Sequence, residues 1–311
     1  MLLTLAAALA IVVQDRTPLR AAPSLRATEL ATLWQGEVLE VRDERAGYLK
    51  VYNYRRERGG YVKTEAVRAI SLNESEAPAL LAVLRFLRDS AGSEALGISY
   101  GAAYLKAAPA GALTAEPLDA IARMAERLAD AASGNGVRHR DVAAHLEVVA
   151  QFGVLMRTFD RNGRMQVCYD GELYRRVLSL SHASSEERAR AALGLTRPDC
   201  IDPALGILQR VVLDEERHEL LDRIEERPLP AMMRSRLHAR RAAVWAAVAY
   251  ESACRGQSPG AAAQRAIAEL VAVHPRDLGE THMDGHQGDS QRLAGEHHAP
   301  LSPMRKPGKQ F

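Results

Sequence analysis

His218 and Glu219 are the first residues to consider for catalytic chemistry, because a histidine followed by a glutamate begins the helical zinc site of many metalloproteases. In that site a second histidine, four residues after the first, binds the same metal from the same helix face. This chain has Asp222 at that position. Arginines alternate with further acidic residues around it, which is typical of a charged helix face in solvent. We therefore predict no zinc site here.

Three other ion- or nucleotide-binding patterns are incomplete. Asp160-Arg-Asn-Gly163 begins like a calcium loop, but Arg164, Met165 and Val167 occupy later ligand positions, so we expect a turn between two elements. The histidines within residues 282–298 are of a type that binds transition metals, yet a tail without a fixed fold would hold a metal weakly. No glycine-rich phosphate loop follows a plausible strand. The sequence therefore predicts no cofactor and no metal, and it identifies no catalytic residue.

The chain has three cysteines, Cys168, Cys200 and Cys254. In an oxidising compartment Cys168 and Cys200 could form a disulfide, which would leave one thiol free. The alternative is that all three are ordinary buried thiols, since cysteine is among the most buried residue types.

Five aromatic residues are candidates to line a ligand groove, because an aromatic body with a polar tip suits a binding surface. The alternative is that two or more of them belong to a hydrophobic core. They are Trp34, Tyr48, Tyr52, Tyr54 and Tyr61.

The segments that carry these aromatic residues alternate as β-strands do. Leu39 and Val41 fall on one face of a strand, and Leu49 and Val51 fall on one face of the next. The polar, glycine-containing stretches 43–47 and 53–60 suit hairpin turns between antiparallel strands. We therefore predict a small, closed β-barrel over residues 16–70, because closure removes exposed strand edges.

The order of these segments resembles that of the extracytoplasmic, bacterial SH3-like domain. The resemblance rests on the opening Thr17–Pro23, the strand Gly36-Glu-Val-Leu-Glu-Val41, the strand Gly47-Tyr-Leu-Lys-Val51 and the closing Gly59-Gly-Tyr-Val62. It implies an SH3-like barrel that binds a ligand, although it does not name the ligand.

SH3-like domains of this kind are often attached to cell-wall peptidases or amidases, so a cysteine nucleophile must be considered. Papain-like cell-wall peptidases place that nucleophile in an Asp-Cys-Ser-Gly turn that opens a helix. This chain has Asp199-Cys-Ile-Asp202, which lacks the Ser-Gly pair. The alternative function is a cell-wall hydrolase or accessory factor, with an unrecognised catalytic centre among Cys200, His218 and Glu219.

The segment Leu2–Val13 is apolar and uncharged, and it is shorter than the roughly 20 residues that a membrane-spanning helix needs. It has the length of a signal-peptide core, with Ala8-Leu-Ala10 as a candidate cleavage site, and we predict a signal peptide over residues 1–13. No lysine or arginine precedes Arg16, which indicates an atypical signal or a misplaced start codon. The alternative is a buried first strand.

From Asn73 onward the apolar period changes from two to 3.6, which predicts an all-helical domain over residues 73–275. Apolar stripes run from Leu80 to Leu87 and from Leu118 to Leu128. Helix starts recur, among them Ser184 with Glu187 as a capping box. We expect seven or eight helices arranged as a bundle or as an irregular array of helical hairpins. Residues 276–311 have the composition of a disordered tail.

Together these features predict an α+β protein that is exported to the periplasm or secreted, and that binds rather than catalyses. Its expected partner is a cell-envelope component or a protein. The formal net charge of +2 gives no reason to expect nucleic acid as a partner. A cytoplasmic location, with a structural N-terminus, is the alternative. The sequence does not indicate the oligomeric state.

Overall fold

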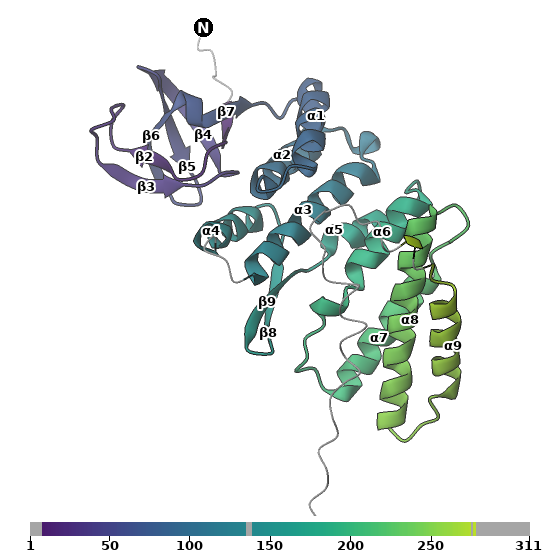
Figure 1. Cartoon of the computed structure of the whole chain (residues 1–311). Coiled ribbons are helices and arrows are strands. Elements are labelled where there is room, and N and C mark those ends of the chain that lie inside the picture. The colour runs from purple at the N-terminus through teal and green to yellow at the C-terminus, as the bar shows by residue number, and fades with distance from the viewer. Residues whose placement is uncertain (1–7, 135–138, 275, 278–311) are drawn as a thin grey trace, which may run out of the picture.

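The computed structural model describes residues 8–134, 139–274 and 276–277. A β-sheet forms one end of the molecule, and the helices continue from it to the other end (Figure 1). The fold class is therefore α+β, as predicted. The strands are β1 (Ala8–Val12), β2 (Thr17–Arg20), β3 (Glu29–Leu33), β4 (Val38–Arg45), β5 (Tyr48–Asn53), β6 (Arg58–Lys63), β7 (Val67–Ile70), β8 (Met156–Arg161) and β9 (Arg164–Tyr169). The helices are α1 (Ala77–Arg88), α2 (Glu94–Ala107), α3 (Ala115–Ser133), α4 (His139–Ala150), α5 (Glu172–Ser179), α6 (Ser185–Leu195), α7 (Ile207–Asp222), α8 (Ala231–Cys254) and α9 (Gly260–Val271), with short 3-10 turns that include η1 (Thr64–Ala66) and η4 (Pro198–Cys200).

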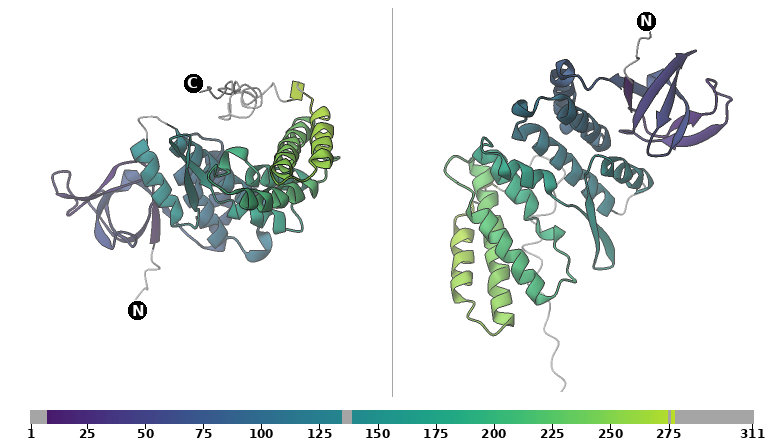
Figure 2. Two further views of the ribbon diagram at one scale, coloured as in Figure 1. Left: turned by 90° about the horizontal axis from the view of Figure 1, so that it is seen from below. Right: turned by 180° about the vertical axis from the view of Figure 1, so that it is seen from behind.

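The first seven strands form one antiparallel sheet in the order β3-β2-β6-β5-β4-β1-β7. The sheet curls around its own hydrophobic core (Figure 2). Within the described residues, however, β3 and β7 at the two ends of this order do not pair with each other, so the predicted closed barrel is wrong. The prediction also did not include strand β1. This strand lies between β4 and β7 and pairs with both, so β7 is an edge strand at the opposite end of the order from β3.

Strand β1 is buried on both faces. Ala10 and Val12 belong to the core of the sheet, whereas Ile11 belongs to a core built mainly from α1 and α2, and all three are fully buried. A strand buried on both faces has apolar residues at every position and therefore lacks the alternation of a half-buried strand. Residues 8–12 of the predicted signal peptide thus form the buried first strand that was the alternative interpretation. Residues 1–7 lie outside the described residues.

The sheet and the first two helices are fixed to each other by direct packing. Val38 and Ile70 contact the same core as Ile11. At Gly36 the backbone passes so close to α2 that an added Cβ would lie 2.7 Å from the carbonyl oxygen of Ala95. The φ angle of Gly36 is +91°, a conformation that other residues rarely adopt. The Ser99 hydroxyl on α2 donates a hydrogen bond to the Gly36 carbonyl at 2.7 Å.

The helices follow several of the predicted patterns. The stripe from Leu80 to Leu87 lies on α1, and the stripe from Leu118 to Leu128 lies on α3, and both are buried. The capping box of α6 is present, because the Ser184 hydroxyl accepts from the Glu187 amide while the Glu187 carboxylate accepts from the Ser184 amide. The described residues contain nine α-helices, where seven or eight were expected. The last three pack on one another in chain order, α7 against α8 and α8 against α9.

The predicted domain over residues 73–275 is not all-helical, because it contains the hairpin β8–β9. Its turn is Asn162-Gly163, and both residues have positive φ angles, as a two-residue hairpin turn requires. Strand β9 packs on α3, where the Ser133 hydroxyl accepts a hydrogen bond from the Val167 amide at 2.8 Å. The prediction of a turn between two elements at Asp160–Gly163 is therefore confirmed, and the two elements are strands.

No helix among the described residues is long and apolar enough to cross a membrane. Of the predicted disordered tail over residues 276–311, all but Arg276 and Asp277 lie outside the described residues.

Replacing Ile11 with alanine should lower the free energy of unfolding by about 3 kcal/mol, because it opens a cavity where the sheet meets α1 and α2. Urea denaturation followed by circular dichroism measures this change. The matched control is Ile267→Ala on α9, whose side chain is 62% exposed and whose removal should change stability by less than about 0.5 kcal/mol. Equal effects of the two substitutions would contradict the buried position of β1.

Candidate functional site

Two adjoining cavities lie at one end of the sheet, where the β1–β2 turn, the start of β5 and the end of β6 meet. The inner cavity has a volume of about 270 Å³ and the outer, more open one about 660 Å³. Leu25, Tyr48, Lys63 and Glu65 line both cavities, so they form one continuous depression, which we call the trough. The trough is lined by residues 14–18, 24–26, 46–48 and 63–66, together with Arg20.

The lining of the trough combines an aromatic ring with an excess of positive charge. Strand pairing places Tyr48 directly opposite Lys63, and Tyr48 is 7% exposed. Lys63 forms an ion pair with Glu65 at 2.9 Å, which raises the pKa of the lysine above its ordinary value. In total, four cations face two carboxylates. The cations are Arg16, Arg20, Arg26 and Lys63, and the carboxylates are Asp15 and Glu65.

Helix α4 holds one wall of the trough in place. His145 Nε2 lies 2.7 Å from Asp15 Oδ1, and Arg16 forms an ion pair with Asp141 at 2.8 Å. Arg16 has a φ angle of +56°, which is uncommon for a residue other than glycine. Burial raises the pKa of the Asp15 carboxyl, but hydrogen bonds from His145 and from the Gln35 amide outweigh burial and hold that pKa below its ordinary value. The β1–β2 turn therefore keeps its conformation through contacts with the helical part of the chain.

Of the five aromatic residues predicted to line a groove, only Tyr48 lies in the trough. Trp34 packs edge-on against His145 at 6.1 Å between ring centres. Tyr52 and Tyr54 contact each other at 5.0 Å on a separate part of the sheet. Tyr61 is half-buried on β6, opposite Arg20 and Lys50 in the pairing. The structure thus does not bring the five aromatic residues together.

The Tyr52–Tyr54 pair makes its own polar contacts. The Arg42 guanidinium lies 4.3 Å from the centre of the Tyr52 ring. The Tyr54 hydroxyl donates to Glu40 at 2.8 Å, and Arg42 also contacts Glu40 at 3.0 Å. These groups satisfy one another on the surface, and we assign them no ligand.

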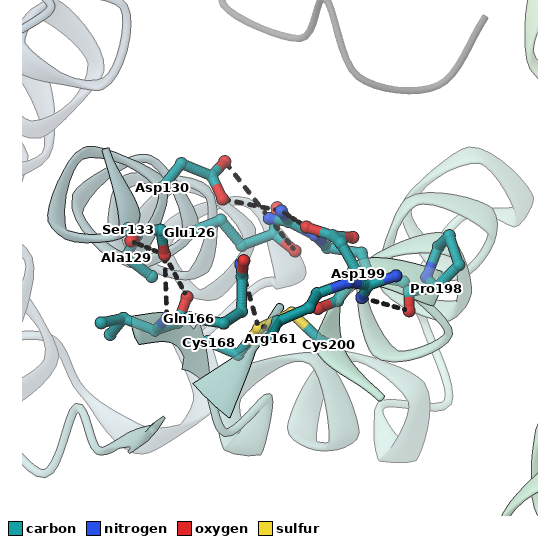
Figure 3. Close-up of polar contacts among 12 residues, drawn as sticks. Glu126, Ala129, Asp130, Ser133, Arg161, Gln166, Cys168, Pro198, Asp199 and Cys200 are labelled. Atoms are coloured by element: carbon teal, nitrogen blue, oxygen red, sulfur yellow. Dashed lines mark hydrogen bonds and ion pairs between the residues drawn. A yellow bond between two sulfur atoms is a disulfide. The ribbon is translucent and has the colours of Figure 1, made fainter. Parts of the chain in front are cut away.

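A second polar cluster surrounds the disulfide between Cys168 on β9 and Cys200 in η4 (Figure 3). The two Cα atoms are 5.7 Å apart, and Cys254 is free and exposed. Beside the disulfide, Arg197 contacts Asp130 on α3 at 2.7 Å and also pairs with Asp199. The disulfide and these ion pairs together fasten η4 to the hairpin and to α3.

Glu126 on α3 lies in the same cluster with little exposure. Burial raises the pKa of its carboxyl to about 7, against the opposing effects of the Arg197 charge and of a hydrogen bond with Tyr174. The Arg197 guanidinium lies 4.0 Å away, and Arg197 is shared with two other carboxylates. Neither of the two cavities described above reaches this cluster, whose ion pairs join the start of η4 to α3.

The residues considered for hydrolysis do not form a catalytic arrangement. Cys200 is in the disulfide and has no free thiol. His218 stacks on Trp245 with ring centres 4.4 Å apart, and Glu219 pairs with Arg223 at 3.1 Å on the surface of α7. In the part of the chain that the structure describes, no group of three or more histidine, cysteine or acidic residues could hold a metal ion. The histidines of residues 282–298 lie outside that part.

Sequence reasoning missed the cations of the trough. Arg20 and Lys63 come from β2 and β6, which are far apart in the chain, and the register of these two strands pairs Arg20 with Tyr61. Alternation in β5 and β6 could have indicated that Tyr48 and Lys63 share a face. Comparison of the chain with protein-family models, with curated proteins and with solved structures found no match.

The raised pKa of Glu126 predicts a pH dependence of stability. The folded protein keeps a proton on this carboxyl up to about pH 7, whereas the unfolded chain loses it near 4.5. The folded state therefore binds more protons between these values, so the free energy of unfolding should fall as the pH rises from 5 to 8, by at most about 3 kcal/mol from this group. In Glu126→Gln this contribution should disappear.

Urea denaturation of both proteins at pH 5 and pH 8 measures this difference. The control is Glu219→Gln, whose carboxylate is exposed. The free energy of unfolding of this control should change between pH 5 and pH 8 by the same amount as that of the unmodified protein. Parallel losses of stability in the unmodified protein and Glu126→Gln would show that Glu126 does not titrate in this range.

Proposed function

We propose that this protein is a non-enzymatic binding or scaffold protein of the extracytoplasmic space. Its SH3-like sheet binds a cell-envelope component or a protein partner at the trough, and its helical part positions the sheet and offers a second contact surface. The observation that carries the proposal is the trough itself, where an aromatic ring and several cations line a cavity whose wall is held by α4.

The chemistry of the trough favours binding over catalysis. A buried aromatic side chain beside a few polar groups is typical of a site that recognises a ligand. The Thr17 hydroxyl, which lines the inner cavity, donates to the Gln14 carbonyl at 2.8 Å. The His145 Nε2 atom is engaged with Asp15. The pairing of a nucleophile with a base that hydrolysis requires is therefore not in place at these residues.

The Cys168–Cys200 disulfide supports the proposed location, because disulfides persist in oxidising compartments and are rare in the cytosol.

The buried position of strand β1 limits where a leader could be cleaved from the chain. Cleavage within Ala8–Ala10, or after Val13, would remove all or part of a strand that contributes to two cores. We therefore propose that residues 8–12 remain in the folded protein. Mass spectrometry of the mature N-terminus tests this directly, and a first residue after Ala8 would contradict it.

Site-specific photocrosslinking in the cells that produce the protein tests the proposed function. A photoreactive residue at position 25, which is exposed at the trough, should give a discrete adduct with a wall component or a protein. The adduct should be lost in Arg20→Glu and retained in Arg58→Glu, because Arg58 is exposed at the other end of β6 from Lys63 and lies outside the trough lining.

The matched control places the photoreactive residue at position 267, which is comparably exposed on α9. The absence of an adduct at position 25, or equal adducts at both positions, would contradict a binding role for the trough. Release of soluble fragments from purified cell walls by the full chain would contradict the absence of enzymatic activity.

A further inference from the structure

Hydrogen-bond donors from three strands line the inner cavity of the trough. Arg20 on β2, Tyr48 on β5 and Lys63 on β6 contribute a guanidinium, a phenol and an ammonium group. Lys63 lies close enough to both groups for them to change its pKa. The charge of Arg20 lowers the pKa of Lys63 and Tyr48 raises it, although Glu65 has the largest effect. Two cations therefore lie side by side at the wall of one small cavity.

The carboxylates of the trough do not compensate all of this charge. Asp15 is engaged by His145, and Glu65 is paired with Lys63. Arg16 is paired with Asp141 on α4. By contrast, the Arg20 guanidinium donates to the Ala27 carbonyl at 2.9 Å, and it forms no ion pair with any carboxylate in the described part of the chain. The Arg20 guanidinium thus lines the cavity with N–H groups that no carboxylate of the described residues accepts.

We propose that the inner cavity of the trough binds a carboxylate, carried on an acidic side chain or chain end of an extended ligand. A planar guanidinium matches the two oxygens of a carboxylate, and such charge-assisted hydrogen bonds are among the strongest in proteins. Lys63 and the Tyr48 hydroxyl supply further donors, while Leu25 and the Tyr48 ring offer an apolar wall to the carbon atoms that carry the carboxylate. This inference rests on the proposed function, because it names the chemistry of the ligand at the same site.

A pair of small probes tests this inference with the full chain. N-acetyl-glutamate N-methylamide and its glutamine analogue differ only in the charged group, and each is titrated into the isotope-labelled protein and followed by NMR. The glutamate probe should bind at least fivefold more tightly and should shift resonances of Arg20, Tyr48 and Lys63. Arg20→Gln and Tyr48→Phe should each weaken this binding, whereas Arg58→Gln at the other end of β6 should leave it unchanged, and well-dispersed spectra of each variant verify its fold.

Inorganic phosphate is the third probe, because a phosphate group presents the same kind of oxygen atoms. Tighter binding of phosphate than of the glutamate probe would overturn the assignment to a carboxylate. Equal binding of the glutamate and glutamine probes, or no binding of either, would also overturn it. The crosslink at position 25 would distinguish these results from failure of the proposed function, because a neutral ligand would still give an adduct there.

Discussion

Strand β1 contributes to two hydrophobic cores at once, and the arrangement of the molecule depends on this. Its even-numbered residues Ala10 and Val12 fill the core of the sheet, while Ile11 fills the core that the sheet shares with α1 and α2. The strand also supplies backbone hydrogen bonds to a neighbour on each side. Because burial of apolar area is the main favourable term in folding, the strand couples the stability of the sheet to that of the helices. The two parts are therefore packed as one structure.

The same strand determines where the trough forms. The chain leaves β1 through the turn that contains Asp15 and Arg16, and both residues line the inner cavity. Contacts from His145 and Asp141 on α4 fix this turn from the other side. A ligand in the trough would thus touch a turn that is held in place by a helix more than a hundred residues away in the chain. The helical part thus contributes to the trough by contacts with its β1–β2 turn, although no described residue of α4 lines the two cavities.

The predictability of the fold varied with the physical signal in each segment. Alternation identified Leu39 and Val51 as core residues, because a half-buried strand displays its period in the sequence. The run at residues 8–12 has no alternation, so its sequence suits both a signal-peptide core and a strand buried on both faces. The hairpin β8–β9 was missed, although Asn162-Gly163 is a strong hairpin signal, because its strands lie among helices. The trough could not be predicted, since Arg20 and Lys63 meet only through long-range strand pairing.

Native-state hydrogen exchange of the β1 amides tests most directly whether this strand joins the two parts. If the strand belongs to both cores, the Ile11 and Val12 amides should exchange only when the whole structure unfolds, at the same free energy as the most protected amides of β5 and α2. Rapid exchange of these two amides, while β5 and α2 remain protected, would contradict the account.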